Sequence, residues 1–144
     1  MKRQASAEWR GGLKDGKGTV SSTSRVLSNT PYSFRSRFED GTETNPEELV
    51  IAAHAACYSM ALSAQLGERG IVPESIRTQA TAEFTKLEQG WTVTEIHLEV
   101  RARVPKADEA AFTSAAEAAK VGCPVSRLLN TRITLSAQLE PQPV

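Results

Sequence analysis

Residues 49–66, which read LVIAAHAACYSMALSAQL, decide the fold. The segment before them predicts how this helix begins. Asn45 is a favourable N-cap, Pro46 suits the first helical position, and Glu48 stands where a capping box places its acidic residue. We therefore predict a helix that runs to about Leu66 and ends at the glycines that follow.

The predicted helix is apolar nearly all round its circumference. A helix without a polar face is normally enclosed by other structure. A chain of 144 residues can hardly cover such a helix on every side. The sequence therefore predicts an obligate dimer in which a second copy supplies part of the cover.

The residues before this helix indicate β structure with turns. Strands are predicted over residues 19–23 and 32–38, the second with Tyr32, Phe34 and Phe38 toward an apolar face and a slip in register near Arg37. Residues 39–42 then form a loop.

The residues after the helix predict a β-hairpin over 76–104, because apolar and polar residues alternate there. Its turn is expected at Gln89-Gly90 and a bulge near 94–95, where the alternation changes face. A helix from Asp108 to about Val121, a short helix over 124–129, a strand over 133–139 and a frayed tail complete the chain. This order predicts an α+β fold in one domain, residues 1–144.

Charge and composition argue against several classes of partner. Seventeen basic residues balance seventeen acidic ones, and the pI is near 6.7. A nucleic-acid or anionic-membrane partner would favour a basic patch. No apolar run approaches the roughly 20 residues that cross a bilayer, and the basic start lacks the apolar core of a signal peptide. We expect a cytoplasmic protein.

The chain has two cysteines, Cys57 and Cys123, and two histidines. Their spacing does not suggest a zinc site, and buried packing is the commonest role of a lone cysteine. Two features favour chemistry. Cys57 follows a run of small residues, and Cys123 stands at the expected N-terminus of a short helix, whose partial positive charge favours a thiolate.

Three segments carry a resemblance to a known family: residues 45–49 (NPEEL), 52–63 (AAHAACYSMALS) and 122–129 (GCPVSRLL). With these motifs the chain resembles the osmotically inducible protein C (OsmC) family, in its OsmC branch. That family includes the organic hydroperoxide resistance proteins. The resemblance implies an intertwined homodimer with buried central helices and reactive pockets between subunits.

The resemblance also implies a thiol-dependent peroxidase that needs no metal or other cofactor. It would reduce organic hydroperoxides and, less efficiently, hydrogen peroxide. Cys57 would be the peroxidatic cysteine and Cys123 the resolving one, joined as an intramolecular disulfide. An external dithiol, from a lipoyl-bearing or thioredoxin-like protein, would then reduce that disulfide.

Attack on a peroxide needs a thiolate, whereas burial raises the pKa of a thiol, so Cys57 needs a nearby cation. The resemblance points to Arg37, with Arg35 as a competitor; the early loop 11–18 offers lysines only. Glu47 would hold the arginine by a bidentate pair. Since Glu47 lies about 15 Å from Cys57 along a straight helix, a break around 53–55 is expected.

The remaining residues near the motifs have two interpretations each. His54 could serve as a base, but a buried, hydrogen-bonded histidine is favoured, and Glu48 is expected only to cap the helix. Phe38, Tyr58 and Met60 are predicted to line a pocket for an apolar hydroperoxide, or else to belong to the core. Two other functions stay open: a redox-responsive module that binds a small ligand, and a structural dimer whose cysteines only pack.

Overall fold

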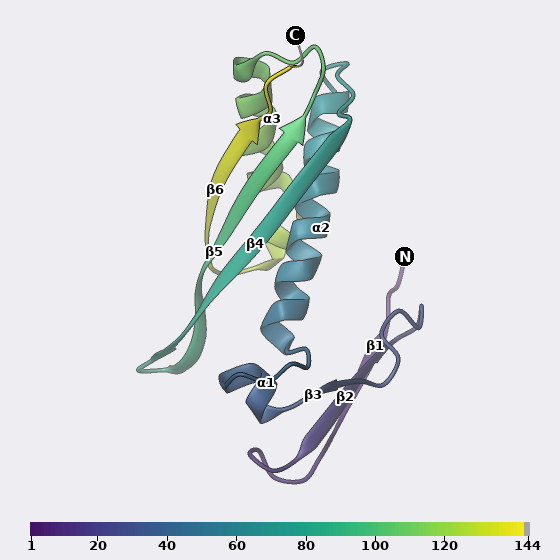
Figure 1. The fold of residues 1–144 in the computed structure, drawn as a ribbon, viewed down its shortest axis with the longest axis vertical. Coiled ribbons are helices and arrows are strands. Elements are labelled where there is room, and N and C mark those ends of the chain that lie inside the picture. Colours follow the sequence, from purple (N-terminus) through teal and green to yellow (C-terminus); the bar gives the residue numbers. More distant parts are fainter. Residues whose placement is uncertain (143–144) are drawn as a thin grey trace. The chain divides into compact units, whose positions relative to one another are not determined.

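The computed structural model describes residues 1–142, and the chain divides into two compact units after Leu49. The N-terminal unit contains β1 (Ala5–Arg10), β2 (Lys17–Ser22), β3 (Thr30–Tyr32), α1 (Phe34–Phe38) and the start of α2 (Pro46–Gly67). The C-terminal unit contains the rest of α2, then β4 (Ser75–Leu87), β5 (Gly90–Arg103), α3 (Glu109–Gly122), α4 (Pro124–Leu128) and β6 (Arg132–Leu139) (Figure 1). The α+β class is confirmed.

The N-terminal sheet has the order β1-β2-β3, with antiparallel pairs. Strand β1 was not predicted, because nearly all of its residues are exposed and little apolar alternation marks it. The rings of Trp9 and Tyr32 lie 5.5 Å apart across Gly18. A Cβ at Gly18 would come within 2.6 Å of the Tyr32 ring, so only glycine lets these two rings meet there.

Residues 34–38 form a helix, so the strand predicted over 32–38 is wrong beyond Tyr32. The Ser36 N–H donates to Ser33 Oγ at 3.2 Å, and the Ser33 N–H donates to Ser36 Oγ at 2.9 Å. These local hydrogen bonds stabilise a helix start against an extended chain. The rings of Phe34 and Phe38 meet at 4.8 Å on this helix. In the sequence alone, two apolar residues four positions apart fit one face of a strand as well as one face of a helix.

The start of α2 is as predicted, but its interior is not. The Glu48 N–H donates to Asn45 Oδ1 at 2.8 Å, which confirms the cap. The Glu48 carboxylate accepts from Thr44 Oγ1 at 2.9 Å rather than closing the capping box. The break expected around 53–55 is wrong: α2 is continuous, and no proline or glycine interrupts it there.

The expectation that no apolar stretch approaches membrane-spanning length is also wrong. Helix α2, with 22 residues, is by length and composition sufficient to cross a bilayer, because its few polar residues are uncharged over most of its length. The core helix of a soluble protein meets the same criteria. One stripe of α2 does pack inside the C-terminal unit, as described below.

The C-terminal sheet has the order β4-β5-β6, with β5 antiparallel to β4 and parallel to β6. Glu83 pairs with Glu95 and Phe84 with Val93, so Thr94 is the extra residue of a bulge. This confirms the bulge predicted near 94–95. The hairpin turn falls at residues 88–89, one position earlier than predicted.

The connection between β5 and β6 contains the helices α3 and α4. The Ala111 N–H donates to Asp108 Oδ1 at 2.7 Å, which confirms the predicted cap of α3, and α4 begins at Pro124 as predicted. Of the tail predicted to fray, residues 141–142 have no regular secondary structure, and the side-chain amide of Gln142 donates to the Val104 carbonyl at 2.9 Å. The last two residues of the predicted tail, 143–144, lie outside the described residues.

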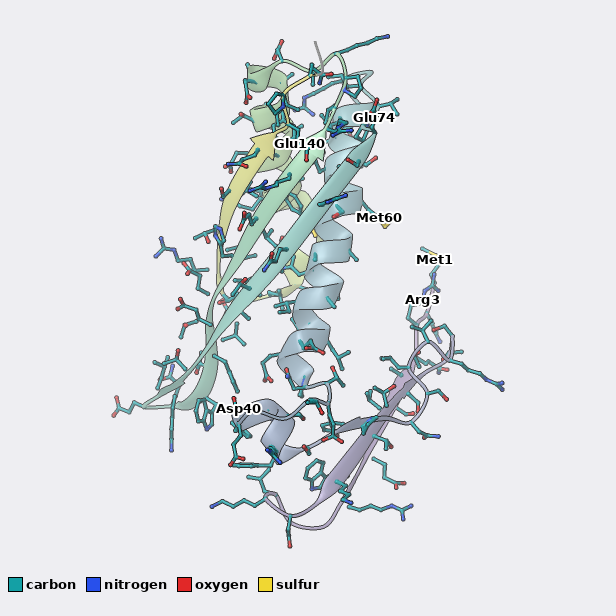
Figure 2. All side chains as sticks on the ribbon, in the orientation of Figure 1. Met1, Arg3, Asp40, Met60, Glu74 and Glu140 are labelled. Atoms are coloured by element: carbon teal, nitrogen blue, oxygen red, sulfur yellow. The ribbon has the colours of Figure 1, made fainter. Side chains whose placement is uncertain are left out.

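Helices α2 and α3 lie on one face of the C-terminal sheet (Figure 1). The buried apolar core there combines residues of α2, β5 and α3: Tyr58, Leu62, Leu66, Ile96, Leu98, Val100, Ala102, Phe112, Ala115, Ala116 and Ala119. On α2 the fully buried residues recur every fourth position, from His54 to Leu66. Met60 points away from the sheet and is 75% exposed (Figure 2).

The cap of α2 predicts a measurable loss of stability in the Asn45→Ala variant. Its side chain accepts from Glu48 N–H and also donates to the Ser36 carbonyl at 3.0 Å. Loss of both bonds should lower the free energy of unfolding by about 1–2 kcal/mol, measured by urea denaturation. Asn45→Asp, which keeps the acceptor, should lose less. Equal stability of Asn45→Ala and the unsubstituted protein would contradict this account of the helix start.

Candidate functional site

The two cysteine sulfurs are neighbours, although 66 positions separate them in the sequence. Cys57 Sγ and Cys123 Sγ lie 2.8 Å apart, and both cysteines are free thiols. Cys57 is half-buried and Cys123 is fully buried. The predicted proximity of the two sulfurs is therefore confirmed, and the pair is close enough for a disulfide to form after a small movement.

Two helix ends fix the position of Cys123. Its N–H donates to the Ala119 carbonyl at 2.9 Å, so it closes α3, and it is also the N-cap of α4. Pro124, whose ring favours the first helical position, makes the chain turn at this point. Cys123 thus lies at a helix–helix junction, as the sequence predicted.

Cys57 is fixed by the packing of its neighbour on α2. The Tyr58 hydroxyl donates to the Ala116 carbonyl of α3 at 3.0 Å, and its ring is fully buried. Burial raises the pKa of Tyr58 well above its ordinary value, so this phenol keeps its proton. Tyr58 therefore holds α2 against α3, and of its two predicted roles the structure places it in the core.

The surroundings of Cys57 within the described chain favour the thiol over the thiolate. Burial raises the pKa of Cys57, and the hydrogen bond and charge of the adjacent Cys123 raise it further. Within residues 1–142, the backbone N–H of Val125, in the first turn of α4, is the one group that lowers the pKa of Cys57. An activating cation would have to reverse this balance.

His54 and Ser126 form a second buried contact beside the sulfurs. His54 Nε2 lies 2.8 Å from Ser126 Oγ, and both side chains are buried. Burial lowers the pKa of His54, which favours the neutral imidazole. This agrees with the predicted buried histidine. Ser126 was not singled out from the sequence, although it lies three residues after Cys123, just as His54 lies three before Cys57.

Arg37 and Glu47 form an ion pair within the N-terminal unit. Arg37 Nη2 lies 2.8 Å from Glu47 Oε1, and Arg37 Nε donates to both carboxylate oxygens at 3.1 and 3.2 Å. This is the pair that the resemblance implies. Arg35 is exposed and makes no side-chain ion pair within the described chain. On a helix, residues two apart point in different directions, so α1 separates the two arginines that a strand would align.

An aromatic pocket of about 230 Å³ lies in the N-terminal unit. It is lined by Trp9, Leu13, Tyr32, Ser33, Phe34, Arg37 and Phe38. The Arg37 guanidinium also lies 5.3 Å from the centre of the Phe38 ring. Of the three residues predicted to line a pocket, Phe38 does so here, whereas Met60 is exposed on α2.

Two free thiols at this distance can form a disulfide, which is the chemistry of thiol redox proteins. The family model for OsmC-like protein matches residues 39–138. The chain is also 49% identical over 138 residues to "Peroxiredoxin OsmC" of Escherichia coli (strain K12), an alignment that covers 96% of each chain, and equally to the same-named protein of Shigella flexneri. The chain belongs to the OsmC family.

Solved structures confirm the fold. An OsmC-like protein of unknown function from Vibrio cholerae aligns with a TM-score of 0.76 at 15% identity, over 96% of this chain and 99% of that one. The organic hydroperoxide resistance protein OhrB of Bacillus subtilis aligns with a TM-score of 0.69 at 24% identity, over 94% and 98%. At these identities the two likenesses define the architecture.

Proposed function

We propose that this protein is a thiol-dependent peroxidase that reduces organic hydroperoxides and, less efficiently, hydrogen peroxide. The observation that carries the proposal is the distance of 2.8 Å between two free cysteine sulfurs. The name of its relative, peroxiredoxin OsmC, supports a peroxide substrate. The organic hydroperoxide resistance proteins among its structural relatives support the organic class.

The catalytic cycle starts at Cys57. Its thiolate attacks the outer oxygen of the hydroperoxide, the O–O bond breaks, and the alcohol leaves with the electron pair of that bond and a proton. Cys57 is left as a sulfenic acid. The two electrons that reduce the peroxide therefore come from the Cys57 sulfur.

Cys123 then resolves the sulfenic acid. Its sulfur attacks Cys57 Sγ, water leaves, and an intramolecular disulfide forms. An external dithiol, on a lipoyl-bearing or thioredoxin-like protein, restores both thiols and becomes a disulfide itself. No resident cofactor takes part in this cycle. A cycle that ends with thiols suits the reducing cytoplasm, where we place the protein.

The peroxidase proposal predicts turnover of cumene hydroperoxide in the presence of dihydrolipoamide. Turnover should vanish in Cys57→Ser, because a hydroxyl is a far weaker nucleophile than a thiolate. Cys123→Ser should complete a first turnover at the normal rate and then accumulate over-oxidised Cys57. Stopped-flow peroxide consumption and intact-mass spectrometry measure the two results.

The same assay distinguishes the alternative function. A single stoichiometric oxidation without further turnover, with either dihydrolipoamide or thioredoxin as donor, would instead support a redox-responsive module. Sustained dithiol-driven turnover in Cys123→Ser would remove the resolving role of that cysteine.

We assign the activating cation to Arg37, which Glu47 holds at two points of its guanidinium. Arginine keeps its charge even in an apolar setting, so it can offset the burial that raises the pKa of Cys57. The aromatic pocket beside Arg37 suits the apolar part of an organic hydroperoxide. Phe38 is the substrate-binding residue in this proposal, whereas Tyr58 and Met60, the other two residues predicted to line a pocket, do not line this one.

Arg37→Met should raise the pKa of Cys57, because the methionine removes the cation while the burial of the thiol remains. The thiolate fraction at neutral pH then falls, and alkylation by iodoacetamide shifts to higher pH by about one unit or more. Arg35→Met is the matched control and should leave the profile unchanged. A profile that moves in the Arg35 variant instead would transfer the role to that residue.

We propose that the protein acts as a homodimer, in one OsmC-like domain of residues 1–144. Ten residues of continuous helix separate Glu47 from Cys57, a rise of about 15 Å. We infer that a second copy supplies the guanidinium, in line with the reactive pockets between subunits that the family resemblance implies. The exposed apolar side chains of the C-terminal unit, among them Met60, Val121 and Leu128, are candidates for cover by that copy.

Met60→Glu should weaken self-association, because a dimer contact would bury the new charge without a partner. Sedimentation velocity over a range of concentrations measures the change, which we expect to be tenfold or more in the dissociation constant, or about 1.4 kcal/mol. Thr113→Glu makes the same change of charge at an exposed polar position of α3 and should associate normally. Equal association of the Met60 variant would contradict a contact at this face of α2.

A further inference from the structure

The buried contact between His54 and Ser126 has no part in the cycle proposed above, yet it lies beside both reacting sulfurs. On α2, His54 is one helical turn before Cys57. On the other side, Ser126 is one turn after Cys123. A 2.8 Å contact between these side chains and a 2.8 Å contact between the sulfurs thus join the same two segments of the chain.

One described side-chain hydrogen bond joins the short helix α4 to α2. Helix α4 has five residues, and Leu128 at its end is 77% exposed. Of the side-chain hydrogen bonds that the structure describes over residues 1–142, the bond of Ser126 to His54 is the one that joins a residue of α4 to α2. The backbone of Val125, in the first turn of α4, also lowers the pKa of Cys57.

Loss of the hydrogen bond between His54 and Ser126 should be energetically costly. His54 is fully buried, and its Nδ1 has no hydrogen-bond partner within the described chain. Removal of the Ser126 hydroxyl would leave both ring nitrogens buried without a partner. A buried polar group without a partner is costly, so the native arrangement of α4 on α2 is favoured over displaced ones.

We propose that His54 and Ser126 are positioning residues that hold α4 on α2 and so keep Cys123 within reach of Cys57. Neither side chain is hydrogen-bonded to a cysteine sulfur in the part of the chain that the structure describes. This inference rests on the proposed function for its biological meaning, but the proximity that it explains is a property of the thiol pair alone.

The position of Cys123 affects which of two reactions the sulfenic acid on Cys57 undergoes. The sulfenic acid either condenses with the Cys123 thiol, forming the disulfide and water, or reacts with a second hydroperoxide, which is reduced to its alcohol while Cys57 becomes a sulfinic acid. The first outcome depends on how often Cys123 is in place. A loosened α4 therefore shifts the partition toward the irreversible product.

The direct test is the effective concentration of the thiol pair, measured anaerobically at equilibrium with reduced and oxidised glutathione. In this reaction one glutathione disulfide oxidises the two protein thiols and yields two glutathione thiols. Ser126→Ala should lower the effective concentration about fivefold, the worth of one net hydrogen bond. His54→Gln, whose amide reaches toward the position of Nε2, should keep it within about twofold of the unsubstituted value.

Thr78→Val is the matched control. It removes a different 2.8 Å contact between hydroxyl groups, that of Ser59 Oγ with Thr78 Oγ1. This contact joins α2 to β4 and not to α4. Both variants should lower the stability to urea, but only Ser126→Ala should lower the effective concentration. With excess cumene hydroperoxide, Ser126→Ala should also gain more Cys57 carrying two added oxygens, seen by intact mass.

An effective concentration in Ser126→Ala equal to that of the unsubstituted protein, or lowered only as far as in Thr78→Val, would overturn the inference. Thiol–disulfide exchange with glutathione involves no peroxide. Failure of the peroxidase proposal would therefore appear as absent turnover with this equilibrium intact, whereas failure of the positioning role would appear in the equilibrium itself.

Discussion

The packing of α2 against the C-terminal sheet and α3 determines where the two cysteine sulfurs lie relative to each other. Four buried side chains, His54, Tyr58, Leu62 and Leu66, set the rotation of the helix about its own axis. With that rotation fixed, Cys57 faces the junction at which α3 ends and α4 begins. The Tyr58 hydroxyl and the Ser126 hydroxyl then tie α2 to α3 and to α4. The proximity of two remote cysteines thus follows from ordinary core packing.

The same packing opposes the chemistry that it makes possible. Burial and the neighbouring sulfur both raise the pKa of Cys57, so the arrangement that favours disulfide formation disfavours the thiolate with which the proposed cycle begins. A guanidinium whose geometry is fixed by a carboxylate is a physical answer to this conflict. The N-terminal unit contains such a pair in Arg37 and Glu47, next to an aromatic pocket. In the proposed function, the C-terminal unit brings the sulfurs together, and the N-terminal unit supplies the cation and the substrate pocket.

The sequence allowed most of this to be predicted where the signal was local or periodic. The caps at Asn45 and Asp108, the hairpin with its bulge at Thr94, and the turn at Pro124 follow from short patterns and are confirmed. The motifs around the two cysteines indicated the family and hence the pair of sulfurs. The failures have physical reasons. Aromatic residues at 32, 34 and 38 fit a strand as well as a helix, and the capping serines decided the outcome. Ser126 carried no signal of its own, because its role depends on a tertiary contact with His54.

The central claim is that Cys57 and Cys123 of one chain form a working dithiol. The most direct measurement is peptide mapping of the oxidised protein. The reduced protein is assembled from a mixture of isotope-labelled and unlabelled chains, treated with one equivalent of cumene hydroperoxide, and then alkylated before the peptides are mapped. The account predicts a single cross-linked peptide that joins Cys57 to Cys123, with both halves labelled or both unlabelled. Mixed-label cross-links, or an oxidised Cys57 beside an alkylated Cys123, would contradict it.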